Sequence, residues 1–408
     1  MQSGWSVVRL LVLFVMASVW GACGPAVPAV PAQGGPPWIE LTTPHVTLWT
    51  DAPASVAREI VADAEHLRQV LLGTAFRSVA REGRIVMIAL RDSDEFHAYA
   101  SDHVGGYMQP AQGNALRQPL IVLPADIPFG GSVRTTAHEM THVLSYALIA
   151  QQPRWFAEGL ATYFETIRLD ADAGTVELGR EPTTDRGEPL RMHALVSLRT
   201  LFSCMDSCAN PGFYVTAWAL FNYLENTHAA QLGQFEQRLA GNQEWQSAWA
   251  AAFPDLTMRD LESNLVVWLT SGSHSLLRFN VKLMDYTVDD RTLGEADIHA
   301  IRALLVPTPE GALAEVEAAR RIEATHVVAN LLWASHGHAL ERDAAQAIAA
   351  AHPDDWRAWS LLAITLHSGS EAFAARDKAC RLAAGNPAIL PPDGLCDEAQ
   401  IRPPRAGS

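Results

Sequence analysis

The sequence predicts an α+β domain followed by an all-α domain, and three observations lead to this prediction. Short apolar runs with the length of strands occur at 45–50, 84–90 and 118–123. Stretches with helical spacing of apolar residues follow at 132–150, 154–166 and 213 to about 270. The region from Ala312 to Ala384 is rich in alanine, which predicts helix throughout.

The bulk composition is that of a globular protein with more than one domain. With 408 residues the chain is too long for one ordinary core. Hydrophobic residues make up 49% and charged residues 18%, which excludes an extensively disordered chain. The formal net charge of -15 repels phosphate backbones, so we expect no nucleic-acid partner.

The N-terminal segment is typical of a secretion signal. Arg9 is its one charged side chain, and the apolar run of 10–20 has the length of a signal-peptide core. We expect a signal peptide at 1–22 and a Pro/Ala/Gly-rich tether at 23–37.

The end of that segment indicates how the protein is held after secretion. Gly21-Ala22-Cys23 resembles the lipobox of bacterial lipoproteins, although Trp20 stands where leucine is usual. The resemblance implies secretion across the inner membrane and a lipid anchor on Cys23. The protein would then lie in the cell envelope, that is, in the periplasm, at the outer membrane or at the cell surface. A plain secretory signal with an incidental cysteine remains the alternative.

The cysteine count fits an oxidising compartment. If Cys23 carries lipid, four of the five cysteines remain. The simplest disulfide pairs are Cys204–Cys208 and Cys380–Cys396, and the sequence also allows other pairings.

The expected boundaries are 38–272 for the first domain and 280–390 for the second, with an irregular tail at 391–408. The segment 352–359 (HPDDWRAW) resembles the turn between helices of tetratricopeptide-type repeats. About two such repeats fit the second domain, which would then bind a protein partner. A plain helical bundle is the alternative.

The strongest motif is His138-Glu139-Met140-Thr141-His142 within the expected helix at 132–150. Residues four apart share one face of a helix, so both imidazoles can reach one zinc ion. Glu139 is rotated by about 100° from His138 and stands beside the metal, where a general base for water belongs.

A third ligand follows in the next helix. A catalytic zinc ion usually takes three protein ligands, and Glu158 lies sixteen positions after His142 in the segment 155–165 (WFAEGLATYFE). A short turn between two antiparallel helices can bring this carboxylate back to the histidines. We therefore expect one Zn2+ per chain on His138, His142 and Glu158.

These segments resemble the gluzincin group of zinc peptidases, in the peptidase MA-like clan. The resemblance implies that His138, His142 and Glu158 bind zinc, that Glu139 is the catalytic base, and that peptides or proteins are the substrate. Gluzincins commonly use a downstream Tyr or His for the oxyanion, and Tyr214 in 213–220 (FYVTAWAL) matches that position. Packing of Tyr214 in the core is the alternative.

The sequence departs from the gluzincin group in two features, and these narrow the class of peptidase that we expect. The aminopeptidase signature G-x-M-E-N is absent, which favours an endopeptidase. Thr162 stands where thermolysin-type enzymes have an Asp, so nothing in the sequence shows what orients the histidines. The region 105–123 could supply an edge strand for an extended peptide. The rival hypothesis is a non-catalytic zinc-binding lipoprotein adaptor that binds protein through its helical module.

Overall fold

The structure is a computed structural model. It describes residues 30–79, 84–101, 104–111, 114–127, 131–182, 195–204, 210–271, 275–384 and 396. The predicted signal peptide, Cys23, Cys208 and the tail apart from Cys396 therefore lie outside the described residues.

A six-stranded sheet forms the centre of the molecule, in the order β4-β5-β3-β2-β1-β9. Its strands are β1 (Ile39–Thr42), β2 (Val46–Thr50), β3 (Ile85–Leu90), β4 (Tyr107–Gln109), β5 (Leu120–Pro124) and β9 (Asp289–Thr292). Strands β2, β3 and β5 are parallel, β1 is antiparallel to β2 and β9, and β4 is antiparallel to β5 at the edge. The three strands expected from the sequence are confirmed.

Helices cover both faces of this sheet, as the burial of β3 shows. Met87 belongs to the core shared with α1 (Ala54–Gly73) and α3 (Gly131–Leu148). Its neighbours Val86 and Ile88 belong to the core shared with α2 (Ser93–Tyr99) and α11 (Glu295–Leu305). Successive side chains in a strand point to opposite faces. A strand that is buried on both sides is therefore one unbroken apolar run in the sequence.

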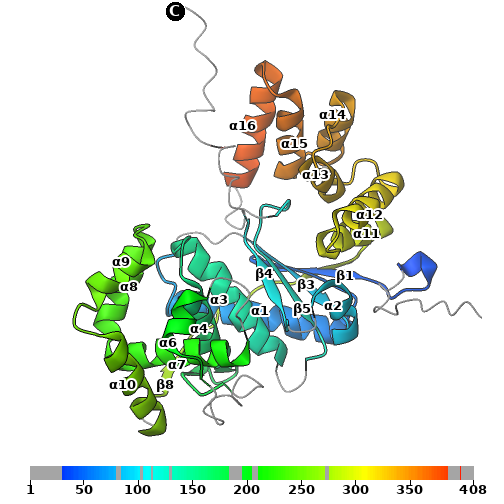
Figure 1. Cartoon of the computed structure of the whole chain (residues 1–408). Coiled ribbons are helices and arrows are strands. Elements are labelled where there is room, and N and C mark those ends of the chain that lie inside the picture. The colour runs from blue at the N-terminus through cyan, green and yellow to red at the C-terminus, as the bar shows by residue number, and fades with distance from the viewer. Residues whose placement is uncertain are drawn as a thin grey trace, which may run out of the picture.

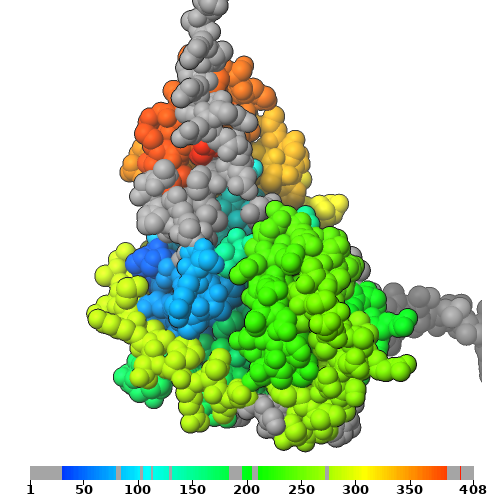
Figure 2. Space-filling model, turned by 90° about the vertical axis from the view of Figure 1, so that its left-hand side faces the viewer, coloured from blue at the N-terminus to red at the C-terminus, as the bar shows by residue number. Residues whose placement is uncertain are grey.

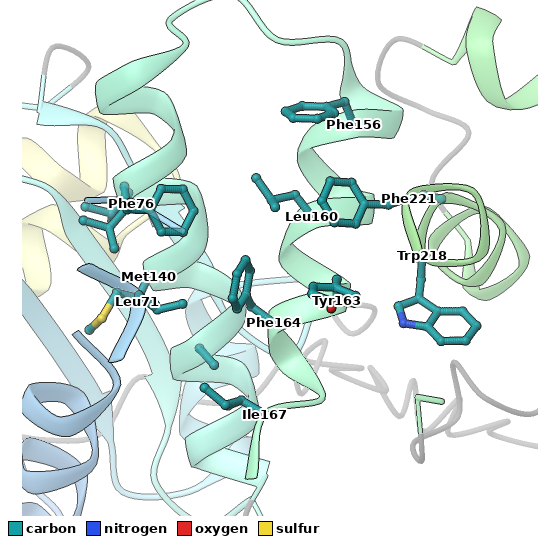
Figure 3. Packing of buried hydrophobic residues seen from close by; sticks show 14 of the residues in the cluster. Leu71, Phe76, Met140, Phe156, Leu160, Tyr163, Phe164, Ile167, Trp218 and Phe221 are labelled. Atoms are coloured by element: carbon teal, nitrogen blue, oxygen red, sulfur yellow. The ribbon is translucent and has the colours of Figure 1, made fainter. Parts of the chain in front are cut away.

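The residues that the sequence assigns to chemistry lie on helices beside α1. Helix α3 is followed after a short turn by α4 (Arg154–Glu165), which packs against α7 (Pro211–Thr227). Figure 3 shows Trp218 and Phe221 of α7 on one side of α4, with Met140 of α3 and Phe76 on the other.

The helical stretch expected from 213 to about 270 consists of four helices. These are α7, α8 (Ala229–Ala240), α9 (Trp245–Ala252) and α10 (Met258–Ser271), preceded by the short α6 (Leu198–Ser203). Asn210 caps α7 through its side chain, and Glu244 caps α9. A wide stack of aromatic rings joins α4 to α8 and α9, centred on Trp155, Phe235 and Trp249.

A second, three-stranded sheet changes the expected domain boundary. It consists of β6 (Arg168–Asp170), β7 (Thr175–Leu178) and β8 (Leu277–Asn280). Strand β8 pairs with β7, and β9 pairs with β1 in the main sheet. The first domain therefore extends past the expected limit of 272, because its sheets take strands from 277–292.

The C-terminal region is a stack of helices. After α11 come α12 (Pro309–Ile322), α13 (Val327–Ser335), α14 (Arg342–Ala351), α15 (Trp356–Leu366) and α16 (Ser370–Ala384). Helix α13 contacts α11 and α15 as well as α12, which is the contact pattern of a helical repeat stack. The stack lies on the side of the sheet away from α8–α10 (Figure 1). Figure 2 shows α8–α10, in green, as a lobe beside the blue α1, with the orange helices at the opposite end.

A polar network fastens this stack to the main sheet. Arg291 of β9 donates to Glu40 of β1 and to Asp297 of α11. His326, which caps α13, accepts from Ala329 N through Nδ1 and lies 3.2 Å from Asp297 through Nε2. Burial alone would raise the pKa of Asp297, but His326 and Arg291 hold that pKa well below its ordinary value.

The predicted tether at 23–37 is folded in the part that the structure describes. Val30 is buried in the core around α2 and α11, and residues Pro31–Gln33 form a 3-10 turn. Ala32 N donates to Glu295 of α11. This part of the segment is attached to the fold because Val30 finds an apolar site there, so an extended tether is not correct for residues 30–37.

The disulfide between Cys380 and Cys396, one of the two expected pairs, is present. Cys204 is also in a disulfide, and its expected partner Cys208 lies outside the described residues. Among the residues that the structure describes, no helix combines the length and the apolar character needed to span a bilayer.

Candidate metal centre

Helix α3 carries His138, Glu139 and His142 in the interior of the molecule. Its apolar side, with Met140 and Leu144, packs into the core on the face of the sheet that α1 covers. The opposite side faces α4, and both histidines are buried there with 4% and 8% of their surface exposed. Glu139 is buried beside them on the same helix.

The structure brings the three expected ligands together. His138 Nε2 and His142 Nε2 are 3.2 Å apart. Glu158 Oε2 lies 3.3 Å from His138 Nε2 and 3.6 Å from His142 Nε2. The three side chains form the one group of this kind among the described residues whose ligand atoms could hold a metal ion.

This triangle has the size of one face of a zinc tetrahedron. Zinc bonds of about 2.0–2.1 Å to nitrogen and oxygen place neighbouring ligand atoms about 3.3 Å apart. The three observed separations of 3.2, 3.3 and 3.6 Å match that value. Each ligand comes from a helix, so the backbone fixes the spacing before a metal binds.

The contacts of His138 show that a cation fits this triangle. His138 Nδ1 lies 3.1 Å from Glu165 Oε2, and a ring nitrogen beside a carboxylate carries the proton. In the neutral ring the lone pair is then on Nε2, which faces both His142 Nε2 and the Glu158 carboxylate. Two imidazole nitrogens and a carboxylate oxygen gathered at this distance could hold a metal ion.

Glu165 is the functional residue that the sequence analysis missed. It is buried, and it orients His138 in place of the Asp that is absent at position 162. The available signal was its spacing, because seven residues after Glu158 correspond to two helical turns and the same face of α4. The partner that Glu165 meets could not be known without the packing of α3 on α4.

Glu158 is one of the charged groups within the site. Burial alone would raise the pKa of this carboxyl, but when the two imidazoles are protonated, hydrogen bonds and charge from His138 and His142 hold the pKa well below its ordinary value. Arg154, one turn earlier on α4, has its Nε 3.9 Å from Glu158 Oε1. Glu158 therefore presents Oε2 to the histidines and Oε1 to a guanidinium.

Helix α7 brings Tyr214 to the site. The Tyr214 ring lies 6.4 Å from the His138 ring, centroid to centroid, and the residue is half-buried. Gly159 makes this approach possible, because a Cβ at that position would lie 2.6 Å from Ala217 O of α7. The glycine thus faces α7. Tyr163 likewise packs against Phe221 of α7.

A cavity of about 840 Å³ lies away from this site. Residues of α6, α7 and α10 line it, among them Leu198, Thr216 and Leu265, and the three ligands do not. The metal centre is defined by its donor atoms and not by the size of a cavity.

Comparisons with known proteins add no family to this picture. No protein-family model matches the chain, and no curated protein is significantly similar to it.

Proposed function

We propose that the chain is a zinc metallopeptidase, in the manner of the gluzincins that its motifs resemble. The observation that carries the proposal is the buried triangle of His138, His142 and Glu158, with Glu139 next to His138 on the same helix. Two histidines and a carboxylate form a ligand set of catalytic zinc, in which a fourth position is open to water and substrate.

When bound, the zinc ion polarises the scissile carbonyl and lowers the pKa of the attacking water. Glu139 acts as the general base that takes a proton from this water. Glu165 keeps the proton of His138 on Nδ1, so that Nε2 is available as a ligand. Tyr214 donates a hydrogen bond from its hydroxyl to the oxyanion that forms on the substrate.

An extended substrate has a binding edge beside this site. Strand β4 (Tyr107–Gln109) is the edge strand of the main sheet and contacts α3. A peptide that pairs with β4 would run past the catalytic helix through backbone hydrogen bonds. This arrangement supports an endopeptidase, because backbone pairing places no requirement on a free terminus.

The proposed location is the cell envelope, with the chain held by lipid on Cys23. The disulfides of Cys380 and Cys204 support an oxidising compartment.

The decisive experiment compares purified residues 30–408 with the Glu139→Gln variant on a library of unstructured peptides, with zinc content measured in both. We expect about one zinc per chain in each protein. Only the unchanged chain should cut, with at least a roughly 100-fold loss of rate in the variant because the base is missing.

The control is Glu225→Gln, which removes the same charge from α7 and should leave cleavage unchanged. Equal cleavage by the Glu139→Gln variant would refute the proposed mechanism. Bound zinc without cleavage by the unchanged chain would favour the adaptor, and absence of zinc would refute the ligand assignment.

A further inference from the structure

The contacts between α3 and α4 follow one another along the two helices. Towards the start of α3, His138 meets Glu165 near the end of α4. One turn further along α3, His142 meets Glu158, which is nearer the start of α4. The two helices are therefore antiparallel, and the next residue on the histidine face of α3 is Tyr146.

Tyr146 lies against the metal centre, one helical turn after His142 on α3. Its ring centroid is 6.2 Å from that of His142, and the rings are inclined by 42°. The phenol lies within the electrostatic reach of both Glu158 and Arg154, although burial is the main reason why its pKa is raised. The side chain thus forms part of the wall around the ligands.

Tyr146 differs from the ligands in its exposure. It is 38% exposed, whereas His142, one turn away, is 8% exposed. A single exposed tyrosine on a surface helix needs no explanation. This one contacts the ring of an expected metal ligand and keeps part of its own surface open to solvent, so it is available to a molecule bound at the metal.

The surroundings of Tyr146 indicate the chemistry of the group that it would contact. Arg154 and Glu158 face each other at 3.9 Å, so these two charges offset one another. An open aromatic ring in a balanced electrostatic environment favours an uncharged, apolar group. Tyr214 lies instead against His138, so the two tyrosines border different histidines.

We propose that Tyr146 determines substrate specificity by packing its ring against an apolar or aromatic side chain next to the scissile bond. The inference rests on the proposed metallopeptidase function and adds a substrate preference to it. The ring, and not the hydroxyl, supplies the contact.

The test measures ligand binding and does not depend on turnover. Two small hydroxamates, one with a benzyl group and one with a methyl group, are titrated by calorimetry into the zinc-loaded chain. The unchanged protein should prefer the benzyl compound, and Tyr146→Ala should reduce that preference about tenfold, the equivalent of one lost aromatic contact. Zinc content should stay the same, and Tyr146→Phe should keep the preference.

Tyr286→Ala is the matched control, since Tyr286 packs on His66 of α1 and its loss should leave the ratio unchanged. A Tyr146→Ala variant that binds zinc and keeps the full benzyl preference would overturn the inference and leave the metallopeptidase proposal intact. If the unchanged protein binds no zinc, or binds neither hydroxamate, the proposed function fails and the inference fails with it.

Discussion

At the scale of single residues, the proposed metal site depends on side chains that do not bind the metal themselves but contact the residues expected to bind it. Glu165 fixes the proton on His138, and Arg154 faces the outer oxygen of Glu158. Such partners orient a ligand and raise its basicity, so their loss weakens metal binding without removing a donor atom.

The variant Glu165→Ala should therefore weaken zinc binding by roughly 10- to 100-fold. The physical reason is that His138 loses the acceptor that holds its proton on Nδ1 and its ring in place. Competition with a chromophoric zinc chelator measures the affinity, and Glu225→Ala on α7 is the control. An unchanged zinc affinity in Glu165→Ala would show that α3 alone sets the orientation of His138.

At the scale of elements, the close contact between α4 and α7 decides whether Tyr214 reaches the metal centre. Phe221 and Tyr163 pack against each other in this interface (Figure 3), and Cβ of Phe221 would lie 3.1 Å from a Cβ on Gly159. Glycine within a helix costs about 1 kcal/mol of stability relative to alanine. At position 159 the absence of a side chain leaves room for the backbone of α7.

We expect Gly159→Ala to lower the free energy of unfolding by about 1–3 kcal/mol, because its Cβ would lie 2.6 Å from Ala217 O. Gly233→Ala on α8 is the matched control, since nothing lies within 4 Å of its Cβ. That change should raise the free energy of unfolding by up to about 1 kcal/mol. Urea denaturation measures both, and a stabilised Gly159→Ala protein would contradict the packing described here.

At the scale of the whole molecule, the sheet joins parts of the chain that are far apart in sequence. Strand β1 near the start pairs with β9 near residue 290, and α11 covers the face of the sheet opposite α3. The metal centre and the helical stack thus share one sheet, and the stability of that sheet is common to both.

A buried acid pair at the carboxyl ends of β2 and β3 makes that stability depend on pH. Asp51 and Glu95 are 5% and 4% exposed and each affects the pKa of the other, while Arg91 N donates to Asp51. Burial raises the pKa of Glu95 to about 8, and it raises that of Asp51 as well. An acid whose pKa is higher in the folded state stabilises the fold less as pH rises, here between about 4.5 and 8.

The variant Glu95→Gln should therefore be more heat-stable than the unchanged chain at pH 8.5, by roughly 3 °C or more in Tm, and the gain should vanish near pH 4.5. The amide stays neutral and can still donate to Asp51. Scanning calorimetry across this range measures the effect, with the exposed Asp94→Asn as control. A Tm difference that does not change with pH would contradict the assignment of this pH dependence to the buried pair of Asp51 and Glu95.

The sequence by itself determined the features that depend on local spacing. His138 and His142 share a helix face because they are four residues apart, and the short turn before α4 returns Glu158 to them. The main strands β2, β3 and β5 were also predictable, since buried parallel strands read as short apolar runs. The helix breaks between 213 and 270 were not predicted, because the helical spacing continues across them.

Only the tertiary structure decided which distant residues meet. Glu165 could be placed on the face of Glu158 but not against His138, and the contact of Gly159 with α7 could not be read from the local pattern. Strands β8 and β9 belong to sheets of the first domain, although the sequence indicated a boundary before them. Each of these contacts joins two segments whose own apolar patterns would allow many packing partners. The packing of the whole chain selects one partner for each segment.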